Sequence, residues 1–579
     1  MAGHRSNKSL LTGYASRCTF IGRVPFYQRA NKASNMKHTS IIRTALLAVL
    51  ILILAAPLGT LRADLLTSDK PIAVFLHTNQ PLIGGLGLSY GDLDQLYQRR
   101  DYKPVWNTNS KKGIKGMQSL LASLKSFMAY HGIERHIFPF GELDSLLAKS
   151  GLNEGEERKA EVLMSGLLLR IAYRLRGMDI NLNHLYPGWE FMPPRHDVSA
   201  GLTTAINNGT IDAYINSLAP SGTTYKQLAD ALKTYREIEA KGGWPPLPTG
   251  PSLKPGMNDP RVPLLRERLA AEGYDVADET GDFYSDALAT MVESYQERNG
   301  LEPDGAIGGK TLSSLNAPVS QKIGQIIASM ERVRQMPRDQ KGRYILINSA
   351  NAWGVLMDGD TILYEAPVIV GRPDRKTPFI QSAIRSVILN PSWHIPSSIA
   401  RKDILPKLRK DPHYLAKMGY VIKGSVDDPH GTNVDWHSIS HSDFHLRLRQ
   451  PPGDMNALGK IKFDFDNDFS VYLHGTPKKS LFNKADRHLS SGCVRLQDPN
   501  ILAAYILEHN EGDWTEEKIQ QTIDNDRTRW IEVQQPMPVW ITHQTVYFPT
   551  GNERPHFAPD KYGYDSLLLE EMAKLSRRI

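Results

Sequence analysis

The sequence predicts a multidomain α+β protein, with an all-α N-terminal part, a three-helix unit and a mixed β-sandwich domain that carries a long insertion. The 579-residue chain is too long for one hydrophobic core, so about three or four domains are expected. Apolar residues recur at helical spacing in the first half and as short runs between turn residues after residue 340. A Pro- and Gly-rich joint at 242–256 separates two helical parts.

The positive charge of the chain is concentrated at its start. The formal net charge is +7, but residues 1–63 hold nine Lys or Arg and no acid. Subtracting nine from +7 leaves −2 for the remainder, which is therefore nearly neutral. A neutral body argues against a nucleic-acid-binding protein.

Residues 1–63 have the pattern of an export segment. Basic residues precede the apolar run 44–56, and small residues follow it, which is the order of a secretory signal peptide. Met36 is an alternative start, because 36–63 alone has the proportions of a signal peptide. An uncleaved membrane anchor is the alternative reading, since 44–61 is just long enough to span a bilayer. Either reading places the rest of the chain outside the cytoplasm, in contact with the inner membrane only through this segment.

Residues 64–245 are predicted to form an all-α domain. The runs 120–127 and 160–171 place apolar residues three and four positions apart. Trp106 and Trp189 are expected in core or interdomain packing rather than in a ligand site.

Residues 255–318 are predicted to form a compact three-helix unit. An amphipathic helix is expected over 261–270, and a second over 285–299 with Ser285 as its N-cap. A third helix starts at Thr311. A further helix over 319–336 follows this unit and ends before a proline.

Residues 340–550 are predicted to form the β domain, followed by a C-terminal tail at 551–579. Short apolar strands are expected at 344–347, 354–357, 361–364, 366–370 and 386–390. The polar, irregular stretch 397–450 is a long insertion between strands. Insertions of this length are usually functional lids or flexible loops.

A single cysteine follows the export segment. Cys493 stands in Ser-Ser-Gly-Cys-Val-Arg, nineteen residues after His474 of Tyr-Leu-His-Gly-Thr. An exported protein with one thiol has no partner for an intramolecular disulfide, so the thiol is a buried apolar group or a nucleophile. The alternating run 469–474 predicts a strand that ends at His474 and turns it away from the apolar face.

A cysteine and a histidine together can perform nucleophilic catalysis. A free thiol has a pKa of about 8.5, so only a few per cent is thiolate at neutral pH. An imidazole within reach takes the proton and returns it to a leaving amine. The N–H groups of Gly492 and Cys493 are expected to stabilise the resulting oxyanion. A buried Cys and a structural His are the alternatives, and the neighbouring glycines favour catalysis.

The stretch 255–318 resembles the small three-helix peptidoglycan-binding domain of cell-wall enzymes. The resemblance is carried by Leu265, Arg268, Leu269, Gly281, Phe283, Ala287, Tyr295, Gln296, Gly300, Leu301, Asp304, Gly305, Gly308, Thr311 and Leu315. It implies binding to the cell wall. A spacer that has lost this affinity is the alternative.

The segment around Cys493 resembles the catalytic motif of L,D-transpeptidases with a YkuD-type domain. The matching parts are His-Gly-Thr at 474–476 and Ser-Ser-Gly-Cys-Val-Arg at 490–495. Further likeness to the large periplasmic, Gram-negative branch lies at 371–378, 390–393, 398–406, 447–453, 456–459 and 480–482. That branch carries a helical scaffold, a peptidoglycan-binding domain and a substrate-capping insertion. Many family members have His where Ser491 stands, but this branch also has Ser there.

The resemblance implies that Cys493 is the nucleophile and His474 the general base. The other implied site residues line the substrate pocket and the oxyanion site: Tyr472, Gly475, Ser491, Gly492 and Arg495. Gly475 would orient the imidazole through its backbone. For Arg495, a buried ion pair that braces the active-site loop is the alternative role.

The implied reaction is cross-linking of peptidoglycan in the periplasm, which serves cell-wall biogenesis and cell shape. The cysteine would attack the amide after the L-centre of diaminopimelate in a donor tetrapeptide stem and release D-Ala. The side-chain amine of an acceptor stem would then resolve the thioester. Other cell-wall synthesis enzymes are candidate partners, carbapenems should acylate the same thiol, and no cofactor is implied. An L,D-carboxypeptidase using the same cysteine and a non-catalytic peptidoglycan-binding scaffold are the alternatives.

Two further patterns superficially suggest metal sites. His437, His441 and His445 have helical spacing, but the serines between them make a helix unfavourable. The acidic run 464–468 lacks the glycine and the distal Glu of an EF-hand loop. We expect no metal site from either pattern.

Overall fold

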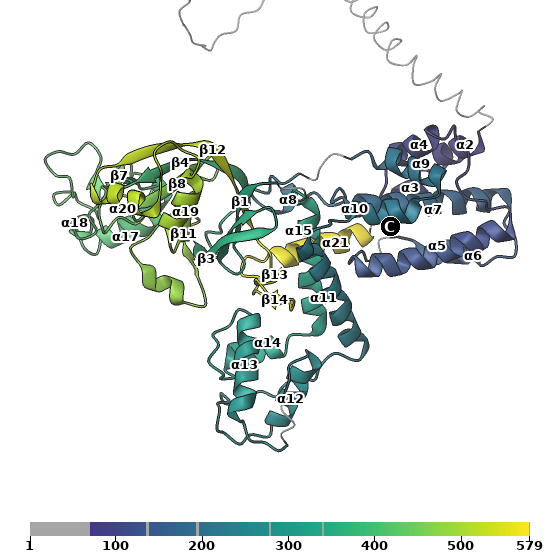
Figure 1. The fold of residues 1–579 in the computed structure, drawn as a ribbon, viewed down its shortest axis with the longest axis horizontal. Helices are drawn as coiled ribbons and strands as arrows, with labels where there is room; N and C mark the ends of the chain where they lie inside the picture. Colours follow the sequence, from purple (N-terminus) through teal and green to yellow (C-terminus); the bar gives the residue numbers. More distant parts are fainter. Residues whose placement is uncertain (1–69, 135–137, 193–195, 277–279, 339–340, 578–579) are drawn as a thin grey trace, which may run out of the picture. The chain divides into compact units, whose positions relative to one another are not determined.

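The computed structural model describes residues 70–134, 138–192, 196–276, 280–338 and 341–577 (Figure 1). The predicted export segment and its alternative start lie outside the described residues. Within the described ranges, no helix is both long and apolar enough to cross a membrane.

The N-terminal described region is helical, as the sequence predicts. Its long helices are α5 (Lys111–Tyr130), α7 (Glu154–Leu175) and α11 (Thr223–Ala240). The shorter ones are α2 (Pro71–Thr78), α3 (Gln80–Gly85), α4 (Tyr90–Gln98), α6 (Phe140–Leu147), α8 (Leu182–Leu185), α9 (Val198–Asn208) and α10 (Ile211–Leu218). Helix α7 is buried on nearly every side from Ala160 onward, so it forms the centre of this core.

The three-helix unit consists of α12 (Val262–Ala271), α13 (Asp286–Arg298) and α14 (Gly309–Leu315) around a core of its own. The Ser285 side chain accepts a hydrogen bond from the N–H of Leu288, which confirms it as the N-cap of α13. Helix α15 (Val319–Gln335) follows and packs along α11.

A buried ionic cluster joins the three-helix unit to α11 and α15. Its centre is Glu272, whose carboxylate binds Lys322 of α15 and accepts hydrogen bonds from Tyr235 at 2.7 Å and Arg268 at 2.8 Å. Burial raises the pKa of Glu272, but Lys322 and Arg268 outweigh it and hold that pKa at about 2. Arg268 also lies 3.8 Å from the centroid of the Trp244 ring in the Pro-rich joint. The joint is therefore anchored to the unit that it precedes.

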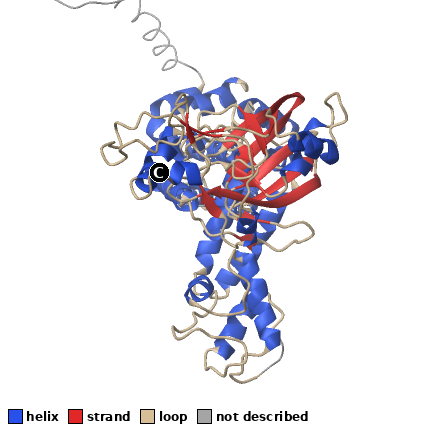
Figure 2. Cartoon of the chain, turned by 90° about the vertical axis from the view of Figure 1, so that its left-hand side faces the viewer, coloured by secondary structure: helices blue, strands red, loops and turns tan. Residues whose placement is uncertain are grey.

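The β domain is one mixed sheet that closes on itself (Figure 2). Its strands are β1 (Arg343–Asn348), β2 (Trp353–Asp358), β3 (Thr361–Gly371), β4 (Ile380–Leu389), β8 (Ile461–Phe465), β9 (Leu473–His474), β10 (His488–Ser490), β11 (Val494–Leu496) and β12 (Arg529–Thr542). They follow the order β10-β3-β11-β9-β8-β4-β12-β1-β2, and β2 pairs back onto β3. The apolar residues inside this ring pack with α19 (Pro499–Leu507) and α20 (Glu516–Asp524).

The closed sheet differs from the predicted sandwich. Register shifts in the pairing of β2 with β3 and of β4 with β12 mark irregularities in the long strands. Such irregularities bend strands and increase their twist, which lets one sheet curl until its ends meet. The sequence predicts two strands that are separated at Glu365, but β3 runs through this residue without a break. The strand can continue because the Glu365 carboxylate lies on the exposed side of the sheet, where it accepts a hydrogen bond from the Trp353 indole at 3.0 Å.

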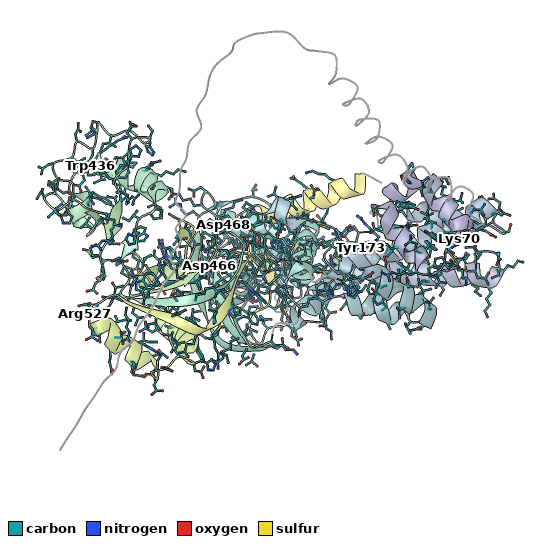
Figure 3. The ribbon with its side chains drawn as sticks, turned by 90° about the horizontal axis from the view of Figure 1, so that it is seen from above. Lys70, Tyr173, Trp436, Asp466, Asp468 and Arg527 are labelled. Carbon is teal, nitrogen blue, oxygen red and sulfur yellow. The ribbon has the colours of Figure 1, made fainter. Side chains whose placement is uncertain are left out.

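The insertion has its own small core. It contains α16 (Ser397–Ile399), the π-helix η2 (Ala400–Ile404), α17 (Leu405–Leu408) and α18 (Tyr414–Lys417). A three-stranded sheet of β5 (Trp393–His394), β7 (Leu448–Gln450) and β6 (Val421–Ile422) completes it. Trp436, labelled in Figure 3, is 1% exposed within this core. We name residues 393–450 the cap.

The C-terminal segment is packed rather than a loose tail. It contains β14 (His556–Phe557), which pairs with β13 (Val546–Tyr547), and α21 (Tyr564–Arg577). Asp565 of α21 forms a buried ion pair with Arg332 of α15 at 2.5 Å. Phe557 and Leu568 belong to one buried cluster with α11 and α15. Trp189 belongs to the same cluster, which confirms its predicted packing role.

Candidate active site

Strand pairing brings the cysteine and the histidine together. Strands β9 and β11 run parallel, with His474 opposite Arg495 and Leu473 opposite Val494. Opposite residues on paired strands, and residues two apart on one strand, share a face of the sheet. Cys493, two residues before Arg495, therefore lies on the same side as Tyr472 and His474.

His474 is buried and oriented by the backbone. It is 5% exposed, and its Nδ1 lies 2.6 Å from the carbonyl oxygen of Gly475. Because a carbonyl only accepts, Nδ1 carries the proton and Nε2 keeps its lone pair. Burial, with a smaller contribution from the Arg495 charge, lowers the pKa of His474 to about 3. The imidazole is therefore neutral at physiological pH.

Gly475 is needed for close packing rather than for an unusual backbone angle. Its N–H donates to the carbonyl of Ile461 at 2.9 Å. A Cβ at this position would lie 3.3 Å from Pro499 and 3.4 Å from the Leu458 carbonyl oxygen. A side chain here would thus displace the backbone whose carbonyl holds the imidazole.

Cys493 is partly exposed, and its thiol is protonated at rest. Its Sγ lies 3.8 Å from the carbonyl oxygen of Ser470. Burial raises the pKa of this thiol, against hydrogen bonds from Tyr472 that lower it. No hydrogen bond joins Sγ to His474 among the described residues. Catalytic hydrogen bonds are often long in the free enzyme and tighten with substrate.

Ser490 shapes the turn that carries Cys493. Its Oγ donates to the Cys493 carbonyl at 2.6 Å and accepts the N–H of Gly492 at 3.0 Å. The Gly492 N–H, which the sequence predicts for the oxyanion site, thus already has a partner in this structure. Gly492 has φ +122°, a conformation that side chains rarely tolerate. The Cys493 N–H makes no hydrogen bond within the described part of the chain and remains available.

Two more of the predicted pocket residues, Tyr472 and Arg495, lie beside the thiol. Tyr472 is partly buried, and its ring centroid is 5.6 Å from that of His474. Burial, and then the proximity of Cys493, raises the pKa of Tyr472. The alternative of a buried ion pair for Arg495 is not supported: no acid pairs with it among the described residues, and its buried Nε has no partner. Burial lowers the pKa of Arg495, which faces Cys493 and His474 instead.

Ser491 is exposed and linked to the cap. Its Oγ accepts a hydrogen bond from Arg375 Nη1 at 3.1 Å, and Arg375 Nη2 binds the carboxylate of Asp403 at 2.7 Å. Asp403 belongs to η2 of the cap. The position that is often His in the family thus connects the active-site loop to the insertion.

A second connection comes from the C-terminal segment. Thr377 Oγ1 donates to the Gly492 carbonyl at 2.8 Å and accepts the N–H of Gly371 at the same distance. The Tyr562 hydroxyl accepts the N–H of Thr377 at 3.2 Å and donates to the Gly371 carbonyl at 2.7 Å. Thr377 lies in a segment noted for its resemblance, but no sequence signal pointed to Tyr562.

The structure does not place the residues of the two metal patterns in an arrangement that could bind a metal. His437 and His441 lie in turns and His445 lies in irregular chain, rather than in a helix. Asp466 and Asp468 are exposed (Figure 3). The described residues contain no group of three or more side chains placed to hold a metal ion.

Three family models match separate parts of the chain. Residues 342–520 match the L,D-transpeptidase catalytic domain of YkuD type. Residues 91–232 match the "Scaffold domain", and residues 258–315 match the "Putative peptidoglycan binding domain". The chain therefore carries an L,D-transpeptidase catalytic domain together with scaffold and peptidoglycan-binding domains, as the resemblance predicts.

The chain is similar over part of its length to known proteins. A "Putative L,D-transpeptidase" from Haemophilus influenzae is 36% identical over 256 residues, 44% of this chain and 50% of that protein. The chain thus spans about half the length of this curated relative.

Two solved structures also match. An L,D-transpeptidase from Xylanimonas cellulosilytica is 14% identical with a TM-score of 0.17, over 51% of this chain and 98% of that chain. A fused Zn-dependent amidase/peptidase/peptidoglycan-binding domain-containing protein from Clostridium acetobutylicum is 11% identical with a TM-score of 0.14. The match covers 51% of this chain and 100% of that chain. TM-scores this low carry no argument.

Proposed function

We propose that this protein is a cysteine L,D-transpeptidase that links two diaminopimelate residues of peptidoglycan and releases D-Ala. The observation that carries the proposal is the pairing of β9 with β11, which sets Cys493 and His474 on one face of the sheet. The catalytic-domain match over 342–520 supports the same chemistry. A cell-wall enzyme of this kind acts outside the cytoplasm, in the periplasm.

In the first half of the reaction, the neutral pair acts in concert. The thiol turns from the Ser470 carbonyl toward His474, and Nε2 takes its proton as Sγ attacks the amide carbonyl of the donor stem. The oxyanion accepts a hydrogen bond from the Cys493 N–H. The C–N bond then breaks, and the imidazolium returns its proton to the amine of the departing D-Ala.

In the second half, the acceptor amine attacks the thioester carbonyl. His474 takes a proton from the attacking amine, the C–S bond breaks, and the sulfur recovers the proton. Gly475 holds the imidazole in one tautomer throughout. If water attacks in place of the amine, the same site is an L,D-carboxypeptidase, which is the second candidate activity.

We also propose that residues 255–318 keep the enzyme on the cell wall. The match to a peptidoglycan-binding domain over 258–315 supports this role. Two residues that carry the resemblance are already used internally: Arg268 in the ionic cluster around Glu272, and Gln296 in hydrogen bonds to Asp304 and Thr311. Binding therefore falls to the exposed face of the unit.

Mass spectrometry of purified protein incubated with tetrapeptide muropeptides tests the catalytic proposal. A diaminopimelate-linked dimer supports the transpeptidase, and tripeptide alone supports the carboxypeptidase. No product, with binding retained, would leave only the scaffold reading. Cys493→Ala must abolish both products and the mass shift from a carbapenem, while circular dichroism confirms that the variant is folded.

A further inference from the structure

One face of the cap sheet gathers positive charge that the reaction above does not use. His394 pairs directly with Arg449 across β5 and β7, and Arg449 pairs with Val421 of β6. Directly paired residues share a face of the sheet, and Lys423, two residues beyond Val421, continues it. The opposite face carries the apolar residues that form the core of the cap.

These three side chains border a groove of about 590 Å³, the size range of a small-ligand site. It is lined by His394, Val421, Ile422, Lys423, Gly424, Ser425, Pro429 and Arg449. The lining contains no acidic residue, and its polar groups are mainly donors.

The two cations of the groove, Lys423 and Arg449, form no ion pair with a carboxylate in the described ranges. Asp428 in the adjoining loop accepts the N–H groups of Thr432 and Asn433. Two cations that share one face without a counter-ion favour an anion from outside.

The strand that carries His394 also contacts the catalytic site through its other face. Trp393, which precedes His394 on β5 and points to the opposite face, hydrogen bonds Tyr472 beside Cys493. Lys462 lies 4.4 Å from the centroid of the Tyr472 ring and is paired with Asp464 at 2.9 Å. Burial, then the charges of Lys423, Arg449 and Lys462, lower the pKa of His394, and the Lys462 charge also acts to lower the pKa of the Cys493 thiol.

We propose that this groove is the subsite for a carboxylate of the acceptor stem peptide, held by Arg449 and Lys423. This inference rests on the proposed function. The acceptor, unlike the donor, must present a neutral amine beside its carboxylates. A cluster of cations binds the carboxylate and disfavours the protonated ammonium at the same time. The groove therefore selects the stem in the form that can attack the thioester.

The test separates the two halves of the reaction. Arg449→Gln and Lys423→Gln should each lower kcat/KM for dimer formation about tenfold, the loss of one charge-assisted hydrogen bond. D-Ala release from a tetrapeptide whose diaminopimelate side-chain amine is acetylated, so that it can act only as a donor, should stay unchanged. Lys410→Gln, which removes an exposed cation of the cap outside the groove, is the matched control and should have no effect.

A second measurement uses an acceptor whose stem carboxylates are amidated. The wild-type protein should use it about tenfold less well than the free acid, whereas the Arg449→Gln variant should hardly distinguish the two. If the Arg449→Gln and Lys423→Gln variants lose D-Ala release and dimer formation equally, the carboxylate belongs to the donor and the proposal is overturned. Unchanged dimer formation in these variants would also overturn it. Failure of the wild-type protein to release any D-Ala would refute the proposed function itself.

Discussion

Removal of one hydroxyl from the C-terminal segment tests whether that segment positions the turn that carries Cys493. Tyr562→Phe keeps the ring, which stacks on His543 with centroids 4.8 Å apart. It leaves the N–H of Thr377 and the carbonyl of Gly371 without this partner. Both groups are buried, and Thr377 also binds the Gly492 carbonyl in the active-site turn.

The magnitude follows from those two hydrogen bonds. Each contributes about 0.5–1.5 kcal/mol net, so their loss amounts to about 1–3 kcal/mol. If the whole loss falls on the reactive geometry of the turn, acylation slows by about five- to 150-fold, since 1.36 kcal/mol is a factor of ten. We therefore expect Cys493 to be acylated by a carbapenem about five to 150 times more slowly than in the wild type. Intact-protein mass spectrometry measures this rate.

The matched control is Tyr564→Phe. The Tyr564 ring lies in the same cluster, but its hydroxyl forms no hydrogen bond among the described residues. This variant should acylate at the wild-type rate. If Tyr562→Phe lowers the free energy of unfolding yet acylates as fast as the wild type, the hydroxyl serves stability alone and the positioning argument is wrong.

Three further predictions follow from the site and its supports. Because the pKa of His474 is lowered to about 3, its base form persists in mild acid, and acylation rates should show no step between pH 5 and 8, where an ordinary histidine titrates. Arg375→Lys should slow acylation several-fold by breaking the link to Asp403, and Asp403→Asn should add nothing when combined with it. Lys322→Met leaves Glu272 buried without its lysine. The free energy of unfolding, measured in urea, should therefore fall by about 3–5 kcal/mol. The folded-state pKa of Glu272 lies below its ordinary 4.5, so the stability that it contributes should be present above that value and be lost as pH falls toward 2.

The motif residues were predictable because their spacing and residue types express local geometry. Ser285 begins its helix as predicted, since an N-cap depends only on the next three residues. The strand predicted over 469–474 shrinks to Leu473–His474 for a local reason that the alternation hides. The Asn467 side chain accepts the N–H groups of Phe469 and Val471, and Ser470 takes φ +55°. A polar turn therefore replaces the first half of the strand.

The supports of the site were not predictable, because they depend on contacts between distant segments. Tyr562 meets Thr377 across 185 residues, and Arg375 meets Ser491 across 116. The residues that flank Tyr562 and Arg375 in the sequence do not distinguish these two side chains from ordinary core or surface positions. Closure of the sheet through β2 and β3 has the same origin, since pairing order is a property of the whole domain.

The contacts of Ser491 explain why a serine can stand where many relatives have histidine. Its hydroxyl accepts a hydrogen bond from Arg375, and Arg375 continues to Asp403 in the cap. A neutral imidazole offers the same acceptor through its unprotonated nitrogen. In the proposed mechanism the proton of Cys493 goes to His474, so this position needs an acceptor for a guanidinium rather than a base. The departure from the family pattern then concerns how the cap is held to the active-site turn, and it leaves the proposed nucleophile and base in place.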